Sequence, residues 1–237
     1  MATAQSTAVT PAARRSTGGF FAFLVKAFFW LFFSLLISIA VEWIGLTFWW
    51  PEEGAQHAIR MYEAELAMLS GDLGQSVFIR DPTSFAGVLV YWVETVWRAS
   101  GLLSLIDWMG TPSSNKNSLH NLIHAAHEYA VATVFVTLVF AVRMAILILS
   151  LPLFVLFGLV GFIDGLVERD LRRFSAGRES AYVFHIAKRA MMPMVVLAWA
   201  IYLSLPFSLH PALVIIPFAV IFALLVGIAA SSFKKYL

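Results

Sequence analysis

The sequence predicts an all-α polytopic membrane protein with four transmembrane helices, an interfacial or periplasmic helical region on the outside, and a cytoplasmic basic loop. The first reason is composition: 60% of the 237 residues are hydrophobic and only 13% are charged, against roughly 45–50% and about 25% in soluble domains. The second reason is a mean hydropathy of +0.83. The third is that Lys and Arg gather beside long apolar stretches, as the positive-inside rule requires.

The sequence also narrows the possible chemistry. It contains no cysteine, which excludes disulfides, thiolate metal sites and cysteine nucleophiles. It has no Walker A loop, no glycine-rich dinucleotide fingerprint and no GxSxG elbow. Glu42 and Asp164 lie at the ends of predicted spans, so the paired intramembrane carboxylates of a proton-coupled transporter are missing. We therefore expect a non-enzymatic protein without a cofactor.

The first 50 residues predict a tail followed by a span. Residues 1–19 are small and polar, with two arginines as their only charges, and are typical of a disordered cytoplasmic tail. Residues 20–50 predict the first transmembrane helix, because some 20 apolar residues at 1.5 Å each cross about 30 Å of hydrocarbon. Trp43, Trp49 and Trp50 at its end predict an aromatic belt at the membrane interface.

Residues 51–127 form the one sizeable water-facing region, which we expect to be helical and periplasmic or interfacial. Within it, residues 83–107 are hydrophobic but carry Glu94 and Arg98 four positions apart, a spacing that allows an ion pair on one helix face. This favours a helix in or near the membrane interface over a fifth membrane segment. The sequence alone leaves both alternatives open.

Residues 128–163 predict the second transmembrane helix, within a helical stretch too long for one upright crossing. Arg143 divides this stretch, and an intramembrane charge is a default functional candidate. We expect the Arg143 side chain to snorkel to the outer interface, leaving residues 144–163 to span. The alternative is a tilted helix that buries Arg143 between its neighbours. Pro152 predicts a kink in either case.

Residues 164–190 predict a cytoplasmic basic loop, and residues 191–233 a transmembrane helical hairpin with a tight turn. With four spans, both termini in the cytoplasm put every dense basic cluster inside. The loop also holds four acidic residues, which favours a salt-bridged helix pair that docks a protein partner or anionic headgroups over direct nucleic-acid binding. The predicted partner contacts are four arginines of this loop: Arg169, Arg172, Arg173 and Arg178.

Two further patterns are candidate sites. His120, His124 and His127 recur along one helical face, and histidines four apart can share a zinc ion. Asn121 stands where a zincin needs Glu, so we expect an interfacial helix and no metal site. Gly161 and Gly165 have the spacing that lets helices approach closely, which predicts helix packing and allows a homo-oligomer.

The segment GFIDGLVERDLRRFSAGRESAYVFHIAKR, residues 161–189, resembles the signature segment of the integrating conjugative element membrane proteins, a domain family of unknown function. The order of spans, acidic outer region, AHEYA stretch and basic loop is similar over nearly the whole chain. Members are encoded in conjugative transfer modules, often beside the coupling ATPase of a type IV secretion system. The resemblance brings no established catalytic residues.

The resemblance implies an accessory of DNA transfer in the bacterial inner membrane. Its partners would be membrane lipid and other conjugation-module membrane proteins, with the coupling ATPase as an example, and no direct nucleic acid is expected. The rival hypothesis is a small transporter or metal-responsive membrane enzyme that uses the His120, His124 and His127 face.

Overall fold

Long apolar stretches interrupted by Gly, Pro and polar residues form helices throughout the computed structural model, which describes residues 19–72, 82–111, 118–174 and 181–232. No strand occurs in these ranges, so the all-α class is confirmed. The helices are α1 (Gly19–Phe48), α2 (Gln56–Asp72), α3 (Pro82–Ala99), α4 (Leu102–Gly110), α5 (Ser118–Leu149), α6 (Leu151–Phe174), α7 (Ala181–Ser204) and α8 (Pro211–Ser231). The expected tail lies almost wholly outside the described residues.

The chain divides into two compact units, Met1–Phe33 and Ser34–Leu237. The first contributes the beginning of α1 to the described residues, with exposed Phe28, Phe29 and Phe33 side chains. The second contains the rest of α1 and all the other helices.

Four helical stretches of the described chain are long and apolar enough to cross a membrane, which confirms the predicted number of spans. They are Val25–Phe48, Leu122–Arg172, Tyr182–Ser204 and Pro211–Ser231. The region 83–107 is not among them. It forms α3 and α4, separated at Gly101, whose φ of 72° lies in the left-handed region that favours glycine.

Helices α5 and α6 follow one another with a single break at Ser150. Pro152, two residues further on, cannot donate a hydrogen bond to the carbonyl four positions before it. The Ser150 carbonyl accepts from the amides of Leu153 and Phe154 instead, which starts α6. At 1.5 Å per residue the two helices together measure about 85 Å, nearly three times the hydrocarbon thickness. A large part of this pair therefore lies outside the bilayer.

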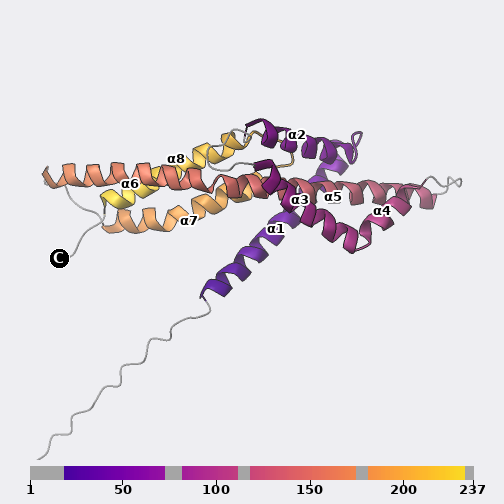
Figure 1. Cartoon of the computed structure of the whole chain (residues 1–237), viewed down its shortest axis with the longest axis horizontal. Helices are drawn as coiled ribbons and strands as arrows, with labels where there is room; N and C mark the ends of the chain where they lie inside the picture. Colours follow the sequence, from indigo (N-terminus) through magenta and orange to yellow (C-terminus); the bar gives the residue numbers. More distant parts are fainter. Residues whose placement is uncertain (1–18, 73–81, 112–117, 175–180, 233–237) are drawn as a thin grey trace, which may run out of the picture. The chain divides into compact units, whose positions relative to one another are not determined.

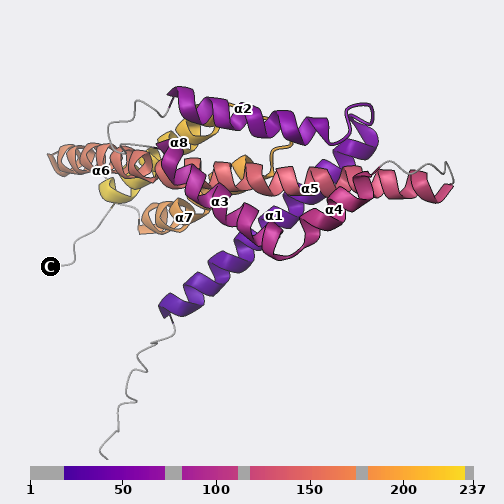
Figure 2. The same cartoon turned by 45° about the vertical axis from the view of Figure 1, so that its right-hand side comes forward.

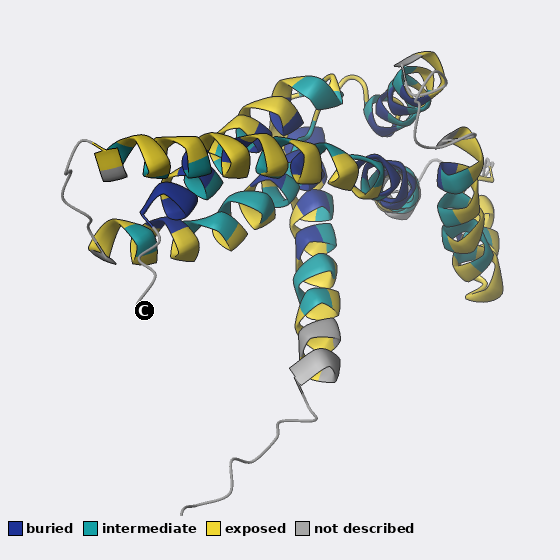
Figure 3. Ribbon diagram, turned by 60° about the vertical axis from the view of Figure 1, so that its left-hand side comes forward, coloured by how far each residue is buried: buried dark blue, intermediate teal, exposed yellow. Residues whose placement is uncertain are grey.

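Helices α6, α7 and α8 form a three-helix bundle, seen together in Figure 1. Glycines bring α6 and α8 into close contact: a Cβ at Gly161 would lie 2.1 Å from the Ala223 carbonyl oxygen, and one at Gly165 would lie 2.3 Å from that of Gly227. Figure 3 shows many exposed residues on the bundle helices, and they include large apolar ones such as Val155 and Met192. This outward apolar surface suits helices whose solvent is lipid.

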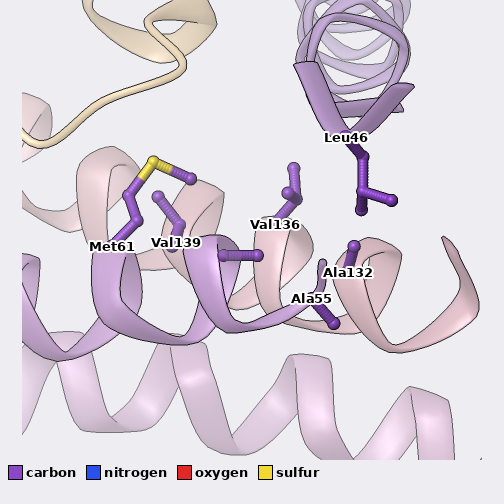
Figure 4. Close-up of a cluster of buried hydrophobic side chains, with 7 residues drawn as sticks. Leu46, Ala55, Met61, Ala132, Val136 and Val139 are labelled. Atoms are coloured by element: carbon purple, nitrogen blue, oxygen red, sulfur yellow. The ribbon is translucent and has the colours of Figure 1, made fainter. Parts of the chain in front are cut away.

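Around α5, helix α2 packs on one side and α3 with α4 on the other, as Figures 1 and 2 show. Small residues allow α2 to approach α5, since Ala58 and Ala132 are fully buried between them. The end of α1 adds Leu46 to the same apolar cluster, shown in Figure 4 with Met61, Val136 and Val139. This second helical group positions the polar residues described next.

Candidate functional site: a buried arginine network

Arg143 lies on α5 with only 1% of its surface exposed. Its Nε donates to Glu65 Oε1 at 2.8 Å. Nη1 donates to the Leu205 carbonyl at 2.6 Å, and Nη2 donates to the Phe207 carbonyl at 2.8 Å. The guanidinium is thus neutralised by one carboxylate and hydrogen-bonded to the turn that joins α7 to α8.

Glu65 comes from α2 and is completely buried. Its second oxygen, Oε2, accepts a hydrogen bond from the Tyr202 hydroxyl of α7 at 3.1 Å. The Arg143 guanidinium also lies 5.5 Å from the centre of the Tyr202 ring, within cation–π range. One carboxylate and one guanidinium therefore connect α2, α5, α7 and the α7–α8 turn.

This arrangement corrects the expectation that Arg143 snorkels to the interface. The side chain is enclosed between neighbouring helices, as the tilted-helix alternative required. A buried guanidinium is tolerated only when it is paired and hydrogen-bonded, and here every interaction is supplied by the protein. Ser208 adds to the same contact, because its hydroxyl donates to the Met61 carbonyl of α2 at 3.1 Å. These hydrogen bonds join α2 and α5 to α7 and the α7–α8 turn, and we call this network the clamp.

A second buried polar pair lies where α1 meets α2. Glu42 is 1% exposed, and its Oε1 lies 2.9 Å from His57 Nδ1. The His57 ring stacks on Trp50 with ring centres 3.9 Å apart. Gly45 makes room for that indole, since a Cβ there would lie 2.0 Å from the Trp50 ring. From the sequence, Glu42 was placed at a span end and no partner was named for it, so its pairing with His57 is a finding of the structure.

The carboxylate of Glu128 on α5 holds the beginning of α2. Its Oε2 accepts from the Ala55 amide at 2.8 Å, and amides at a helix start lack partners within the helix. Gly54 next to it has a φ of 55° and no room for a Cβ, which would lie 2.7 Å from the same oxygen. The AHEYA stretch thus contributes a helix-capping acid.

Tyr62 lies between α2 and α5, edge-on to Phe135 with ring centres 6.0 Å apart. Burial raises the pKa of the Tyr62 phenol above its usual range, and the negative charge of Glu94 on α3 raises it further. The phenol therefore stays uncharged at physiological pH.

The histidine face does not come together as a metal site in the described part of the chain. His124 is exposed, and the rings of His124 and His127 are tilted with centres 6.3 Å apart. His127 packs against the end of α4, where a Cβ on Gly110 would lie 2.8 Å from its Nε2. The side chain of His120 lies outside the described residues. No group of three or more metal-ligating side chains occurs among those that are described.

The predicted partner contacts lie at the far end of the bundle. Arg172 donates to Glu168 at 2.6 Å, one turn earlier on α6. Arg169 lies 3.8 Å from the Asp170 carboxylate. The side chain of Arg173 and the whole of Arg178 lie outside the described residues.

Gly161 and Gly165 face α8 of the same chain. The close approach that the glycine spacing allows is therefore made within one molecule, on the face through which the sequence also allowed a homo-oligomer.

Sequence reasoning missed Glu65, Tyr202 and the α7–α8 carbonyls as partners of Arg143. A signal for Glu65 was present: it follows Ala58 and Met61 and precedes Leu69 on one buried stripe of α2. An acid in that register implies a cation opposite. The Leu205 and Phe207 carbonyls could not be identified as partners from the sequence, because every residue has a backbone carbonyl.

A family model described as IncC plasmid conjugative DNA transfer protein DtrJ-like matches residues 49–234, from the end of α1 to just beyond α8. No curated protein and no solved structure matches the chain.

Proposed function

The chain belongs to the DtrJ-like family of conjugative DNA transfer proteins, and from this premise we propose that it is a non-enzymatic inner-membrane accessory that docks a cytoplasmic partner of the transfer apparatus. The family confirms the expected link to a conjugation module, and the four apolar spans confirm a membrane protein. The accessory role, the partner and the orientation are the proposal. The coupling ATPase is the partner we expect.

The observation that carries the proposal is the surface where α6 ends and α7 begins. Phe174 is 91% exposed and Tyr182 is 74% exposed, at helix ends that also carry basic and acidic residues. Large aromatic side chains among charges at an exposed end are typical of protein contact sites.

The distribution of basic residues supports a cytoplasmic position for this surface under the positive-inside rule. The cluster 169–189 holds six Lys and Arg, whereas the α7–α8 turn, residues 205–210, holds none. The same count supports the proposed orientation with both termini inside. A cytoplasmic position is the one in which a coupling ATPase reaches these side chains.

Charge reversal tests the docking. Changing Arg169, Arg172, Arg173 and Arg178 to Glu is expected to abolish co-purification of the coupling ATPase, because four cations become four anions at the proposed contact. A matched control changes Arg60 and Arg98 of the outer helices to Glu and is expected to leave co-purification intact. Both variants are first checked for membrane insertion by carbonate extraction. Full co-purification by the inserted four-Glu variant would remove these arginines from the proposal.

Metal analysis separates the proposal from the rival hypothesis. The purified full chain is expected to carry no stoichiometric zinc, since His124 is exposed and no third ligand joins His124 and His127 among the described residues. Near-stoichiometric zinc that is lost in His124→Ala would favour a metal-responsive membrane enzyme or transporter instead.

A further inference from the structure

A groove lies between the three bundle helices near the end where α6 finishes and α7 starts. It encloses about 470 Å³ and is lined by Phe162 and Leu166 of α6, Phe184 and Met191 of α7, and Ala229 of α8, together with Arg169. We call it the end groove. Its volume is in the range of sites that hold a small molecule or a lipid segment. Arg169 is the charged residue in this otherwise apolar wall.

The Arg169 guanidinium has a donor without an acceptor. Its Nε is buried and makes no hydrogen bond within the described residues. The Asp170 carboxylate lies 3.8 Å from it, beyond hydrogen-bond distance. By contrast, the buried Nε of Arg143 is satisfied by Glu65 at 2.8 Å. Burying a hydrogen-bond donor without an acceptor is costly, so an acceptor other than the described residues is expected at Arg169.

A second cation lies beside one of the residues that line the groove. The Lys188 ammonium is 5.9 Å from the centre of the Phe184 ring, which lines the groove. Lys188 is one helical turn beyond Phe184 on α7, so a cation of α7 lies next to the groove that Arg169 of α6 lines. An apolar wall with cations at one end matches an amphiphile with an acyl chain and an anionic head.

The position of the groove along the spans also fits a lipid. Ala229 lies within the last turn of the α8 span Pro211–Ser231, which is about as long as the hydrocarbon is thick. Arg169 therefore lies near the level at which lipid phosphates lie. The nearby Ile186 and Met192 side chains are exposed and apolar, which leaves the surface around the groove suited to lipid.

We propose that the end groove binds one anionic phospholipid, with its phosphate at Arg169 and Lys188 and its acyl chain against Phe162, Leu166 and Met191. Basic pockets between transmembrane helices are a recognised setting for anionic headgroups. An acidic peptide fits less well, because its backbone amides and carbonyls would have no partners along the apolar wall. The inference uses the membrane location of the bundle and does not require the coupling ATPase.

The test is lipid binding to the purified full chain, measured by native mass spectrometry during titration with phosphatidylglycerol or phosphatidylcholine of identical acyl chains. Phosphatidylglycerol is expected to bind more tightly. Arg169→Gln and Lys188→Gln are each expected to weaken phosphatidylglycerol binding about fivefold and to leave phosphatidylcholine unchanged. Ala229→Phe is expected to weaken both lipids, because the new ring fills the space of the acyl chain.

Arg172→Gln is the matched control, since Arg172 lies on α6 close to Arg169 but does not line the groove. It is expected to retain wild-type lipid binding, and thermal unfolding confirms that each variant is folded. Lys188 is exposed and lies outside the proposed partner contacts, so a lipid effect of Lys188→Gln is independent of docking. Because the four-Glu variant also changes Arg169, Lys188→Gln separates the two proposals: weaker phosphatidylglycerol binding with normal ATPase co-purification affects the lipid site alone.

Three results would overturn the lipid site: equal affinity for both lipids in the wild type, wild-type phosphatidylglycerol binding by Arg169→Gln and Lys188→Gln, or complete displacement of phosphatidylglycerol by millimolar inorganic phosphate. The last result would assign Arg169 to a soluble phosphate. Retained phosphatidylglycerol binding in the presence of phosphate supports the acyl-chain contact.

Discussion

Arg143 joins residues far apart in the chain: Glu65 is 78 positions away, and the Leu205 carbonyl 62. An isolated charge in an apolar run can be recognised from the sequence, and Arg143 was identified in this way. How the Arg143 charge is stabilised could not be predicted, because the same residue can snorkel or be buried. The outcome depends on which polar groups the neighbouring helices supply. Glu65 also resembled the charges of a solvent-facing helix, since Arg60 and Glu63 lie close by.

Breaking the Arg143–Glu65 pair from one side is expected to be strongly destabilising. Glu65→Gln leaves a buried guanidinium without its counter-charge, which costs about 3–5 kcal/mol in comparable buried pairs. The measurement is the thermal unfolding midpoint of the detergent-purified protein, followed by tryptophan fluorescence. Arg60→Gln is the control, because its pair with Glu53 is exposed and is worth at most about 1 kcal/mol.

The double change Glu65→Leu with Arg143→Met sharpens this prediction. Removing both charges leaves no unpaired ion, so the double variant is expected to unfold at a higher temperature than either single variant. A double variant no more stable than Glu65→Gln would mean that the hydrogen bonds to Leu205 and Phe207 outweigh the ion pair.

At the level of elements, the sequence predicted the long spans well and their contacts less well. Apolar length determines whether a helix can cross a bilayer, so the four spans followed from composition alone. Pro152 likewise predicted a kink, and the helix breaks at Ser150. The spacing of Gly161 and Gly165 predicted a close helix contact but not its partner. Small residues allow approach by any helix, and here α8 is the one that approaches.

The α6–α8 contact is expected to tolerate no side chain at Gly161. Gly161→Ala places a Cβ 2.1 Å from the Ala223 carbonyl oxygen, and such overpacking typically costs about 1–3 kcal/mol. Gly87→Ala on α3 is the matched control: its Cβ meets nothing within 4 Å, so the higher helix propensity of Ala is expected to raise stability slightly. Thermal unfolding compares the two variants. Oligomer size from light scattering is expected to stay unchanged, and a shift toward monomer in Gly161→Ala would restore the self-association hypothesis.

At the level of the molecule, membrane sidedness is the property on which the docking proposal depends. Gly177→Cys introduces a unique thiol between α6 and α7, because the chain contains no cysteine. An impermeant maleimide is expected to label it only after the cells are broken. Thr111→Cys, after α4, is expected to react in cells whose outer membrane alone has been opened. Labelling of position 177 from outside would reverse the orientation, and the partner contact would then need another location.

The four spans and the excess of basic residues could be derived from the sequence because each is a sum over many residues. The clamp could not be derived from the sequence, because its hydrogen bonds depend on the exact relative positions of three helices and a turn. The pairing of Glu42 could not be derived from the sequence either, since its partner His57 is on the next helix and the packing of that helix buries Glu42.

The clamp also imposes an order on biogenesis. Ribosomes deliver Glu65 first, Arg143 next, and Tyr202 with the Leu205 and Phe207 carbonyls last. Until the final hairpin has been inserted, the acid and the guanidinium lack most of their enclosure. A chain that stops short of residue 202 therefore exposes polar groups that the finished protein conceals.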